Sequence, residues 1–247
     1  MKAMLLCAGR STRLGALGTD LPKPMLRLAG RPVLEWTIRR LADAGIAEVV
    51  INLHHAPTVI PAFFGDGSGW GLRITYLEEP ELLGTAGAVR NARDILGGDS
   101  SFMVVYGDTP LDWDPAPFIA DHDARGAVAS LVVAEVVDPS QLGVVVFDAQ
   151  GRVTAFYEKP GHRPELGRWV NAGACIFGPP VFDHIPGTGR PDLGADVLPS
   201  LVAAGLPVYV YRRPRPLVVV DTPEQYRATL GTWQPPDRLE PCTGRPG

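Results

Sequence analysis

Short β-branched runs alternate with amphipathic stretches along the first half of the chain, and this alternation constrains the fold more than any other feature. We expect strands over 2–7, 48–52, 73–77 and 101–106, separated by helices over 33–44, 57–64 and 85–96. Strands that alternate with helices usually pair in parallel, because each helix carries the chain back to the same edge of the sheet. The sequence therefore predicts an α/β sandwich.

The second half changes pattern after the fourth strand. It predicts strands over 128–136, 144–147, 153–157 and 172–177 with no long helix between the last three, so the sheet becomes mixed. Helices over 179–185 and 193–204 and strands over 208–212 and 217–220 follow, and Thr222-Pro223 has the form of a helix N-cap with Pro at N1. We expect one domain over 1–230 and a Pro-rich tail over 231–247 that either hangs free or wraps the surface.

Charge and cysteine content exclude several classes of protein. The formal charge of -4, from 23 Lys and Arg against 27 Asp and Glu, argues against a broad basic surface for nucleic acid or acidic lipid. No apolar run approaches the ~18 residues that span a bilayer, so we expect a cytoplasmic protein. Cys7, Cys175 and Cys242 lack C-x-x-C spacing, which argues against a disulfide framework or a structural zinc site, and the first two are expected to be buried and inert.

The loop after the first strand, residues 6–24, carries the most chemical information. Small residues at Ala8, Gly9 and Ser11 allow backbone N–H groups to approach an anion, and Arg13 and Lys23 supply positive charge for a phosphate. The loop matches neither the Walker pattern nor G-x-G-x-x-G. Taken alone, such a loop is more often a plain surface loop with two solvated cations.

The loop resembles the signature of the sugar-1-phosphate nucleotidylyltransferases, A-G-x-G-[ST]-R-L followed by P-K-P-[ML]-L. The matching residues are Ala8-Gly9, Thr12-Arg13-Leu14 and Pro22-Lys23-Pro24-Met25-Leu26. Ser11 stands where the family has its second Gly, which keeps a small side chain but loses freedom in φ. The resemblance implies a Rossmann-like three-layer sandwich with a mixed, mainly parallel sheet, of the GT-A-like nucleotidyltransferase fold. It also implies that Ala8, Gly9, Ser11 and Thr12 bind the nucleotide and that Arg13 and Lys23 are catalytic.

Residues 65–92 are similar to the nucleobase-binding region of that family, and closest to its guanylyltransferase-like branch. The resemblance implies that Glu79, Gly84 and Thr85 contact the nucleotide. A carboxylate at Glu79 would suit the N1–H and N2–H₂ donors of guanine, which favours GTP. From sequence alone, a solvated acid in a loop explains Glu79 equally well.

Two acids are candidate metal ligands. Asp108 follows an apolar strand, where open α/β sheets place ligand-handling residues. The resemblance implies that Asp108 binds Mg²⁺ together with Asp221, which precedes Thr222-Pro223-Glu224, although the family commonly has the longer D-x-G-T-P. A hard cation takes such carboxylates with phosphate oxygens and water. Alternatively, Asp221 is only an acid at a helix N-terminus.

A third group resembles the family's sugar motifs. Glu158-Lys159-Pro160 matches E-K-P, Gly143 lies upstream, and Asn171-Ala172-Gly173 matches N-x-G. The resemblance implies that Gly143, Glu158 and Asn171 meet the sugar and Lys159 its phosphate, whereas an isolated Glu-Lys pair is ordinarily a solvated surface pair. His54 and His55 point in opposite directions at a strand end, so we expect structural or rim residues.

Together these resemblances imply Mg²⁺-dependent nucleotidyl transfer from a nucleoside triphosphate, with GTP favoured, to a mannose- or heptose-type sugar 1-phosphate. The products would be an NDP-sugar and pyrophosphate, and the protein a monomer or homodimer that binds neither nucleic acid nor membrane. Two alternatives stay open. One is a uridylyl-, thymidylyl- or cytidylyltransferase acting on another sugar phosphate or on phosphocholine, and the other is a non-catalytic regulatory protein that binds nucleotide sugars.

Overall fold

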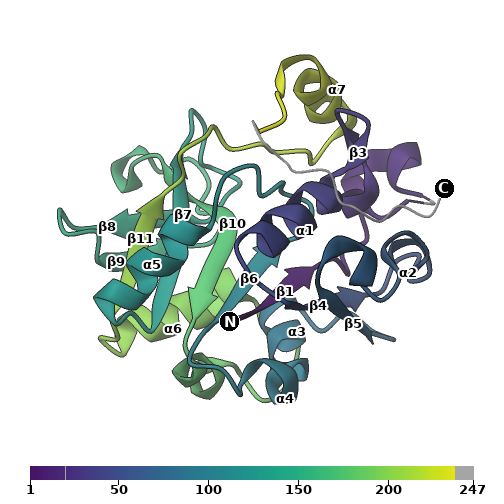
Figure 1. The fold of residues 1–247 in the computed structure, drawn as a ribbon. Coiled ribbons are helices and arrows are strands. Elements are labelled where there is room, and N and C mark those ends of the chain that lie inside the picture. The colour runs from purple at the N-terminus through teal and green to yellow at the C-terminus, as the bar shows by residue number, and fades with distance from the viewer. Residues whose placement is uncertain (20, 237–247) are drawn as a thin grey trace. The chain divides into compact units, whose positions relative to one another are not determined.

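The computed structural model describes residues 1–19 and 21–236, and the chain divides into two compact units (Figure 1). Unit 1 combines Met1–Leu82, Val105–Pro115 and the chain from Val218 onward, while unit 2 combines Leu83–Val104 with Ala116–Leu217. Each unit is therefore built from segments that are distant in sequence.

Unit 1 is organised around three parallel strands, β1 (Lys2–Leu6), β4 (Glu48–Leu53) and β5 (Arg73–Glu78). Helices α1 (Val33–Asp43) and α2 (Val59–Phe64) lie between them in the chain. Strand β6 (Phe102–Tyr106) passes from unit 2 into unit 1, where the N–H of Gly107 donates to the carbonyl of Leu6 at 3.0 Å. The carboxyl ends of β1 and β6 therefore meet, at the edge where parallel sheets bind ligands.

Short elements complete unit 1. They are the 3₁₀ turns η1 (Thr12–Gly18), η2 (Lys23–Met25) and η3 (Ser68–Trp70), the hairpin of β2 (Arg27–Leu28) with β3 (Arg31–Pro32), and helix α7 (Pro223–Thr232). The hydroxyl of Tyr226 on α7 donates to the carbonyl of Arg27 at 2.9 Å. This bond joins the C-terminal helix to the N-terminal hairpin, and Figure 1 shows α7 beside β3.

Unit 2 contains a mixed sheet. Strand β7 (Ala129–Glu135) pairs antiparallel with β10 (Trp169–Phe177) and parallel with β11 (Val208–Arg212). Strands β8 (Val144–Phe147) and β9 (Val153–Tyr157) form an antiparallel hairpin, and β8 also pairs with β10. The helical segments are α3 (Thr85–Asn91), α4 (Arg93–Leu96), α5 (Ala116–Arg125), η4 (Pro164–Leu166), η5 (Pro179–His184), the π-helical η6 (Leu193–Val197) and α6 (Leu198–Ala203).

The predicted α/β architecture with a mixed, mainly parallel sheet is confirmed, with several local differences. The helix predicted over 85–96 breaks at Ala92 into α3 and α4, and the one over 193–204 begins as the π-helical turn η6. The strand predicted over 217–220 is wrong, because those residues pair with no strand. Helix α5 was not predicted, since only Phe118 and His122 of its residues are buried.

The apolar residues around 217–220 pack in a small core instead of pairing as a strand. Val220 is buried with Leu14 and Leu26, and Leu21, Val218 and Tyr226 pack against them. We call Leu14, Leu26 and Val220 the loop cluster, because these three residues come from η1, from the Pro22–Leu26 turn and from the segment before α7. Burial of apolar side chains holds these three irregular segments together without strand pairing.

The part of the predicted tail that directly follows α7 is packed on unit 1. Trp233 packs edge-on against Trp36 of α1 with ring centroids 5.1 Å apart, and its indole N–H donates to Asp112 at 3.1 Å. Trp233 thus anchors the start of the segment 233–236 on unit 1. Residues 237–247, with Cys242, lie outside the described residues. Among the helices of the described chain, none has the length and apolar character needed to cross a bilayer.

Candidate functional site

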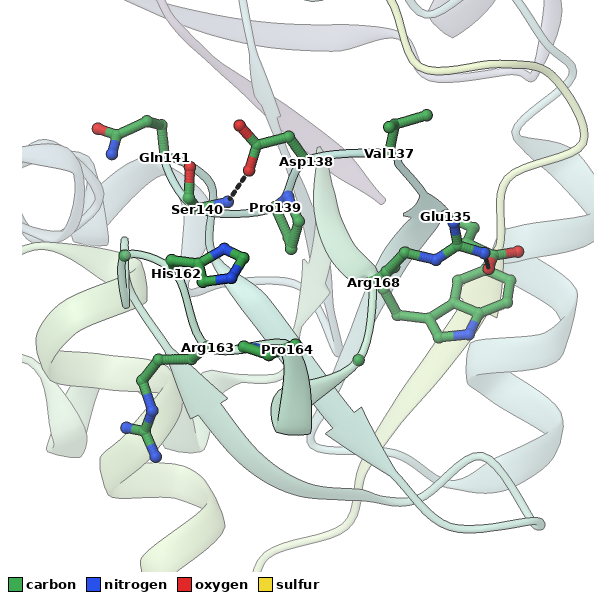
Figure 2. Close-up of a pocket in the computed structure, with 13 residues that line it drawn as sticks. Glu135, Val137, Asp138, Pro139, Ser140, Gln141, His162, Arg163, Pro164 and Arg168 are labelled. Carbon is green, nitrogen blue, oxygen red and sulfur yellow. Dashed lines mark hydrogen bonds and ion pairs between the residues drawn. The ribbon is translucent and has the colours of Figure 1, made fainter.

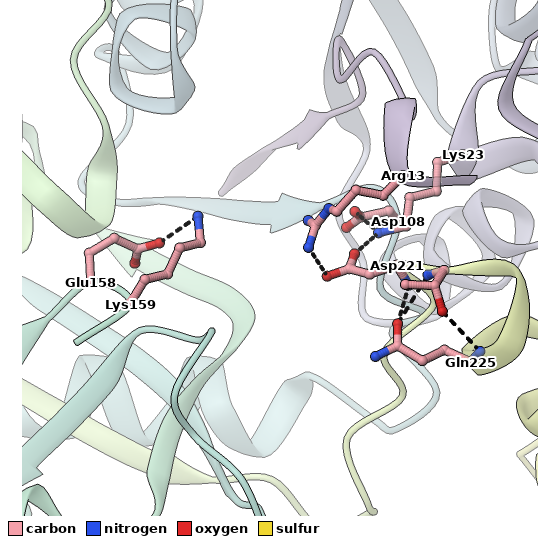
Figure 3. A network of polar contacts seen from close by, with 8 residues as sticks. Arg13, Lys23, Asp108, Glu158, Lys159, Asp221 and Gln225 are labelled. Atoms are coloured by element: carbon pink, nitrogen blue, oxygen red, sulfur yellow. Dashed lines mark hydrogen bonds and ion pairs between the residues drawn. The ribbon is translucent and has the colours of Figure 1, made fainter. Parts of the chain in front are cut away.

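Four charged residues of unit 1 that the sequence singled out meet in one network (Figure 3). The ammonium of Lys23 contacts Oδ2 of Asp108 and lies 2.6 Å from Oδ1 of Asp221. Arg13 Nη1 lies 3.0 Å from the other oxygen of Asp221. Two cations therefore face two carboxylates, although Lys23 and Asp221 are 198 residues apart in the chain.

Sequence neighbours of these residues explain their placement. Arg13 precedes Leu14, and Asp221 follows Val220, and both of these apolar residues belong to the loop cluster. Lys23 lies three residues before the third member, Leu26. Asp108 follows Gly107, which is bonded to the end of β1. A small buried core thus fixes the backbone from which the charged side chains extend.

Charge on Lys23 is favoured in this setting. Burial opposes the ammonium, whose side chain is 13% exposed, but the charges of Asp108 and Asp221 and their hydrogen bonds outweigh burial and raise the pKa of Lys23 above its ordinary value. Arg13, by contrast, is 65% exposed. One cation is held inside the network, and the other lies at its solvent side.

Helix α7 orients Asp221. Thr222 forms the predicted N-cap, with its hydroxyl accepting from the N–H of Gln225 in a full capping box. Oε1 of Gln225 also accepts from the N–H of Asp221 at 2.8 Å. The cap fixes the residue before the helix as well as the helix start. The structure therefore gives Asp221 more than the role of a helix-terminal acid, because its carboxylate contacts Lys23 and Arg13.

The two acids fit a divalent cation. Asp108 and Asp221 present one oxygen each to a single positive centre, the ammonium of Lys23. A hard cation such as Mg²⁺ uses one or two carboxylates and takes its remaining ligands from phosphate and water. Within the described residues there is no group of three or more His, Cys, Asp or Glu placed to hold a metal alone. The donor set thus suits a metal that arrives with a phosphate substrate.

The phosphate loop follows β1. Ala8 is buried, whereas Gly9 and Thr12 are exposed, and Ser11 is partly buried with φ at 55°. That φ lies in the left-handed region, which glycine adopts without cost and other residues rarely adopt. The substitution noted in the sequence therefore falls at a position whose backbone still has the conformation suited to glycine.

Glu79 is buried rather than solvated, with 2% of its surface exposed. Its Oε1 accepts from the side-chain amide of Asn52 at 2.8 Å, and the amide oxygen of Asn52 accepts from the N–H of Cys7, also at 2.8 Å. Asn52 thereby links the ends of β1, β4 and β5. The sequence motifs do not single out Asn52, although a polar residue near the carboxyl end of an otherwise apolar strand is a usable signal.

The two histidines diverge, as their positions at a strand end predict. Nδ1 of His54 lies 2.8 Å from the carbonyl of Glu79, and Nε2 of His55 lies 2.8 Å from the carbonyl of Gly18. Each ring therefore bonds a backbone oxygen. These bonds tie the chain after β4 to the end of β5 and to η1.

In unit 2, the predicted sugar residues also gather. Lys159 Nζ lies 3.1 Å from Oε1 of Glu158, and the N–H of Asn171 donates to the carbonyl of Gly143 at 2.8 Å. A Cβ added to Gly143 would lie 2.9 Å from Oε2 of Glu158 and 2.5 Å from the ring of Phe156. Gly143 is thus required for the close approach of the glutamate.

Gly84 and Thr85 lie in unit 2, and Glu79 lies in unit 1. Gly84 has φ at 79°, and a Cβ there would lie 2.5 Å from the carbonyl of Pro191. The hydroxyl of Thr85 donates to Asp192 at 2.8 Å and accepts from the N–H of Leu193 at 2.7 Å. Both residues therefore hold the start of α3 against residues 190–193. Their contact with a nucleotide stays a prediction.

A pocket of about 780 Å³ lies in unit 2 between the loops 137–141 and 161–169 (Figure 2). Gly161 N–H donates to the carbonyl of Ser140 and joins the two walls, and Lys159 N–H donates to the carbonyl of Leu142 beside the first wall. Both arginines of its lining are paired, Arg168 with Glu135 of the same lining and Arg163 with the neighbouring Glu165. The pocket adjoins the segments that carry Gly143 and Lys159.

The fold is α/β with a mixed, mainly parallel sheet, and it carries two cations and two carboxylates in one network, with Asp108 directly after the carboxyl end of β6. Residues 2–216 match the family model described as nucleotidyl transferase. The chain therefore belongs to the nucleotidyl transferase family, and it has the GT-A-like fold of that family.

Individual relatives of the chain are named as nucleotidyltransferases that act on sugar 1-phosphates. A UTP--glucose-1-phosphate uridylyltransferase from Synechocystis sp. is 34% identical over 85% of this chain and 57% of its own length. A mannose-1-phosphate guanylyltransferase from Mycobacterium tuberculosis is 38% identical over 82% of this chain and 56% of its own length. The chain thus spans little more than half the length of these relatives. The crystal structure of HddC from Yersinia pseudotuberculosis matches with a TM-score of 0.77 at 25% identity, covering 94% of this chain and 99% of that one.

Proposed function

We propose that this protein transfers a nucleotidyl group from a nucleoside triphosphate to a sugar 1-phosphate, releasing pyrophosphate. The observation that carries the proposal is the convergence of Lys23, Arg13, Asp108 and Asp221 in unit 1. Carboxylates that accept a metal beside cations that bind phosphate are the parts that phosphoryl-transfer sites share. Uridylyl and guanylyl transfer to sugar 1-phosphates are the activities named for the two relatives.

In the proposed mechanism, an oxygen of the sugar phosphate attacks the α-phosphorus in line and pyrophosphate leaves. A general base is unnecessary, because a phosphate monoester is already largely anionic at neutral pH. The N–H groups of the loop after β1 bind the triphosphate, and exposed Arg13 stabilises the charge of the departing pyrophosphate. Lys23 binds phosphate oxygens through an ammonium that its surroundings keep charged.

Asp108 and Asp221 would hold the cation, which we propose to be Mg²⁺. When bound, it would neutralise phosphate oxygens and favour attack at phosphorus. The two acids need no ligand from a third acid, because phosphate and water complete the octahedral set. Ala8, Gly9, Ser11, Thr12, Gly84 and Thr85 are the remaining proposed nucleotide contacts.

We propose GTP as the donor and a mannose- or heptose-type sugar 1-phosphate as the acceptor. In the sequence, the carboxylate of Glu79 favours guanine because it only accepts hydrogen bonds and guanine offers two donors on one edge. In the structure this carboxylate is buried and Oε1 accepts from Asn52, so the choice of GTP rests on the relatives. The M. tuberculosis relative supports the same pair, and the Synechocystis relative makes UTP with glucose 1-phosphate the pair to test against it. Gly143, Glu158, Lys159 and Asn171 would bind the sugar phosphate.

The test measures pyrophosphate release with Mg²⁺ for each nucleoside triphosphate combined with each sugar 1-phosphate of a small panel. We expect release with GTP and a mannose- or heptose-type acceptor, reduced by at least ~100-fold in Asp108→Asn. Asp43→Asn, which changes an exposed acid of α1 in the same unit, is the matched control and should leave the rate unchanged. Pyrophosphate release with another nucleoside triphosphate would refute only the assignment of GTP as the donor. Tight binding of an NDP-sugar without turnover of any pair would favour the non-catalytic regulatory protein.

A further inference from the structure

Ser11 departs from the glycine of the family signature, and its side chain has a specific partner. Its hydroxyl oxygen accepts a hydrogen bond from the backbone N–H of Lys23 at 3.0 Å. Lys23 stands between Pro22 and Pro24, and proline has no N–H. The N–H of Lys23 is therefore the one backbone donor of this three-residue segment, and Ser11 is the residue that bonds it.

The backbone of Ser11 is held firmly in an unfavourable conformation. Its φ of 55° lies where a side chain strains the backbone, and its carbonyl accepts from the N–H of Leu14 at 3.0 Å. A Cβ built on Gly18 would lie 2.6 Å from that same carbonyl, so η1 closes tightly over Ser11. Strain of this kind persists only where the surroundings enforce it, and it is commonest at functional sites.

We propose that Ser11 is a positioning residue that fixes the ammonium of Lys23 relative to the phosphate loop. The serine joins the loop after β1 to the rigid Pro22–Pro24 segment, so that the loop and the ammonium keep one geometry. A glycine at position 11 would relieve the backbone but release this bond. In this chain the hydrogen bond to Lys23 compensates for the conformation that glycine would adopt freely. The inference rests on the proposed role of Lys23 in catalysis.

Two substitutions separate the bond from the strain. Ser11→Ala removes the hydroxyl and keeps the strain, whereas Ser11→Gly removes the hydroxyl and relieves the strain. We expect kcat to fall by about 10- to 100-fold in both variants, because a small misplacement of a catalytic group has effects of this size. We expect Tm to fall by about 2–4 °C in Ser11→Ala and by less, or not at all, in Ser11→Gly.

The decisive comparison repeats Ser11→Ala in a Lys23→Ala background. The backbone N–H at position 23 remains there, so the fall in Tm should persist, but the ammonium is gone, so kcat should fall by less than about twofold further. A residue that merely stabilises the loop would lower kcat by the same factor in both backgrounds. Ser68→Ala, which removes an exposed hydroxyl bonded to Asp66 at 2.6 Å in the same unit, is the control and should change neither quantity.

Each result decides the proposal. Wild-type kcat in Ser11→Gly or Ser11→Ala would overturn it, as would an equal loss of kcat in the two backgrounds. Full turnover in Lys23→Ala itself would overturn the catalytic role of Lys23, and the role of Ser11 with it. These failures are distinguishable, because an error about Ser11 alone leaves Lys23→Ala strongly impaired.

Discussion

Asn52 joins three strand ends through one side chain, and its replacement by leucine tests how the carboxyl ends of β1, β4 and β5 are held together. The substitution roughly preserves volume but removes the partner of the Cys7 N–H and a partner of the Glu79 carboxylate, both groups belonging to residues 2% exposed. Leaving a buried N–H unpaired costs about 1–2 kcal/mol, and removing a hydrogen bond to a buried carboxylate costs about 2–3 kcal/mol. We therefore expect Asn52→Leu to lower the free energy of unfolding by about 3–5 kcal/mol.

Urea unfolding followed by circular dichroism measures this loss. Asn91→Leu, an exposed asparagine of α3, is the matched control and should change stability by less than about 0.5 kcal/mol. The double variant Asn52→Leu/Glu79→Leu should lose less than the sum of the two single losses, because it leaves no carboxylate to be deprived of its amide. A loss below about 1 kcal/mol for Asn52→Leu, or strict additivity in the double variant, would refute the reasoning.

Three further predictions follow from other buried or capped residues. Thr222→Ala should lower the free energy of unfolding by about 1 kcal/mol through loss of the N-cap, and should weaken metal-dependent turnover because Asp221 loses its orientation, as a Mg²⁺ titration of the rate would show. Burial lowers the pKa of His122, so the unfolded chain binds a proton more readily than the folded chain does. The free energy of unfolding should therefore fall as the pH drops below about 6.5, and His122→Gln should reduce this pH dependence in urea titrations. Burial raises the pKa of Cys7, and that of Cys175 to about 12, so neither thiol should react with iodoacetamide until the protein unfolds, as mass spectrometry of labelled peptides would show.

Much of the fold could be predicted because its signals are local. Strands β8 and β9 begin and end where the runs of β-branched and aromatic residues indicate, and α7 begins at its Thr-Pro signal. The apolar run 217–220 looks equally like a strand, but a strand requires a partner that the local sequence does not specify. Val220 packs instead in the loop cluster.

The candidate site was predictable only in part. Resemblance to a family signature identified Arg13, Lys23 and the two acids as candidate site residues. Their contacts with one another depend on segments that tertiary packing brings together. Asn52 was missed because its strand reads as a continuous buried run, in which one amide has no visible partner until β1 and β5 are in place. Local patterns identify elements, whereas hydrogen-bond partners between distant elements require the fold.

The separation of Lys23 from Asp221 by 198 residues also has a consequence for biosynthesis. A ribosome releases the chain from its N-terminus, so Lys23 and Asp108 emerge long before Asp221 and the helix that orients it. A nascent or prematurely terminated chain that ends before Asp221 contains β1, β4 and β5 but lacks one of the two acids. The charged network can therefore assemble completely only after translation has run past Asp221.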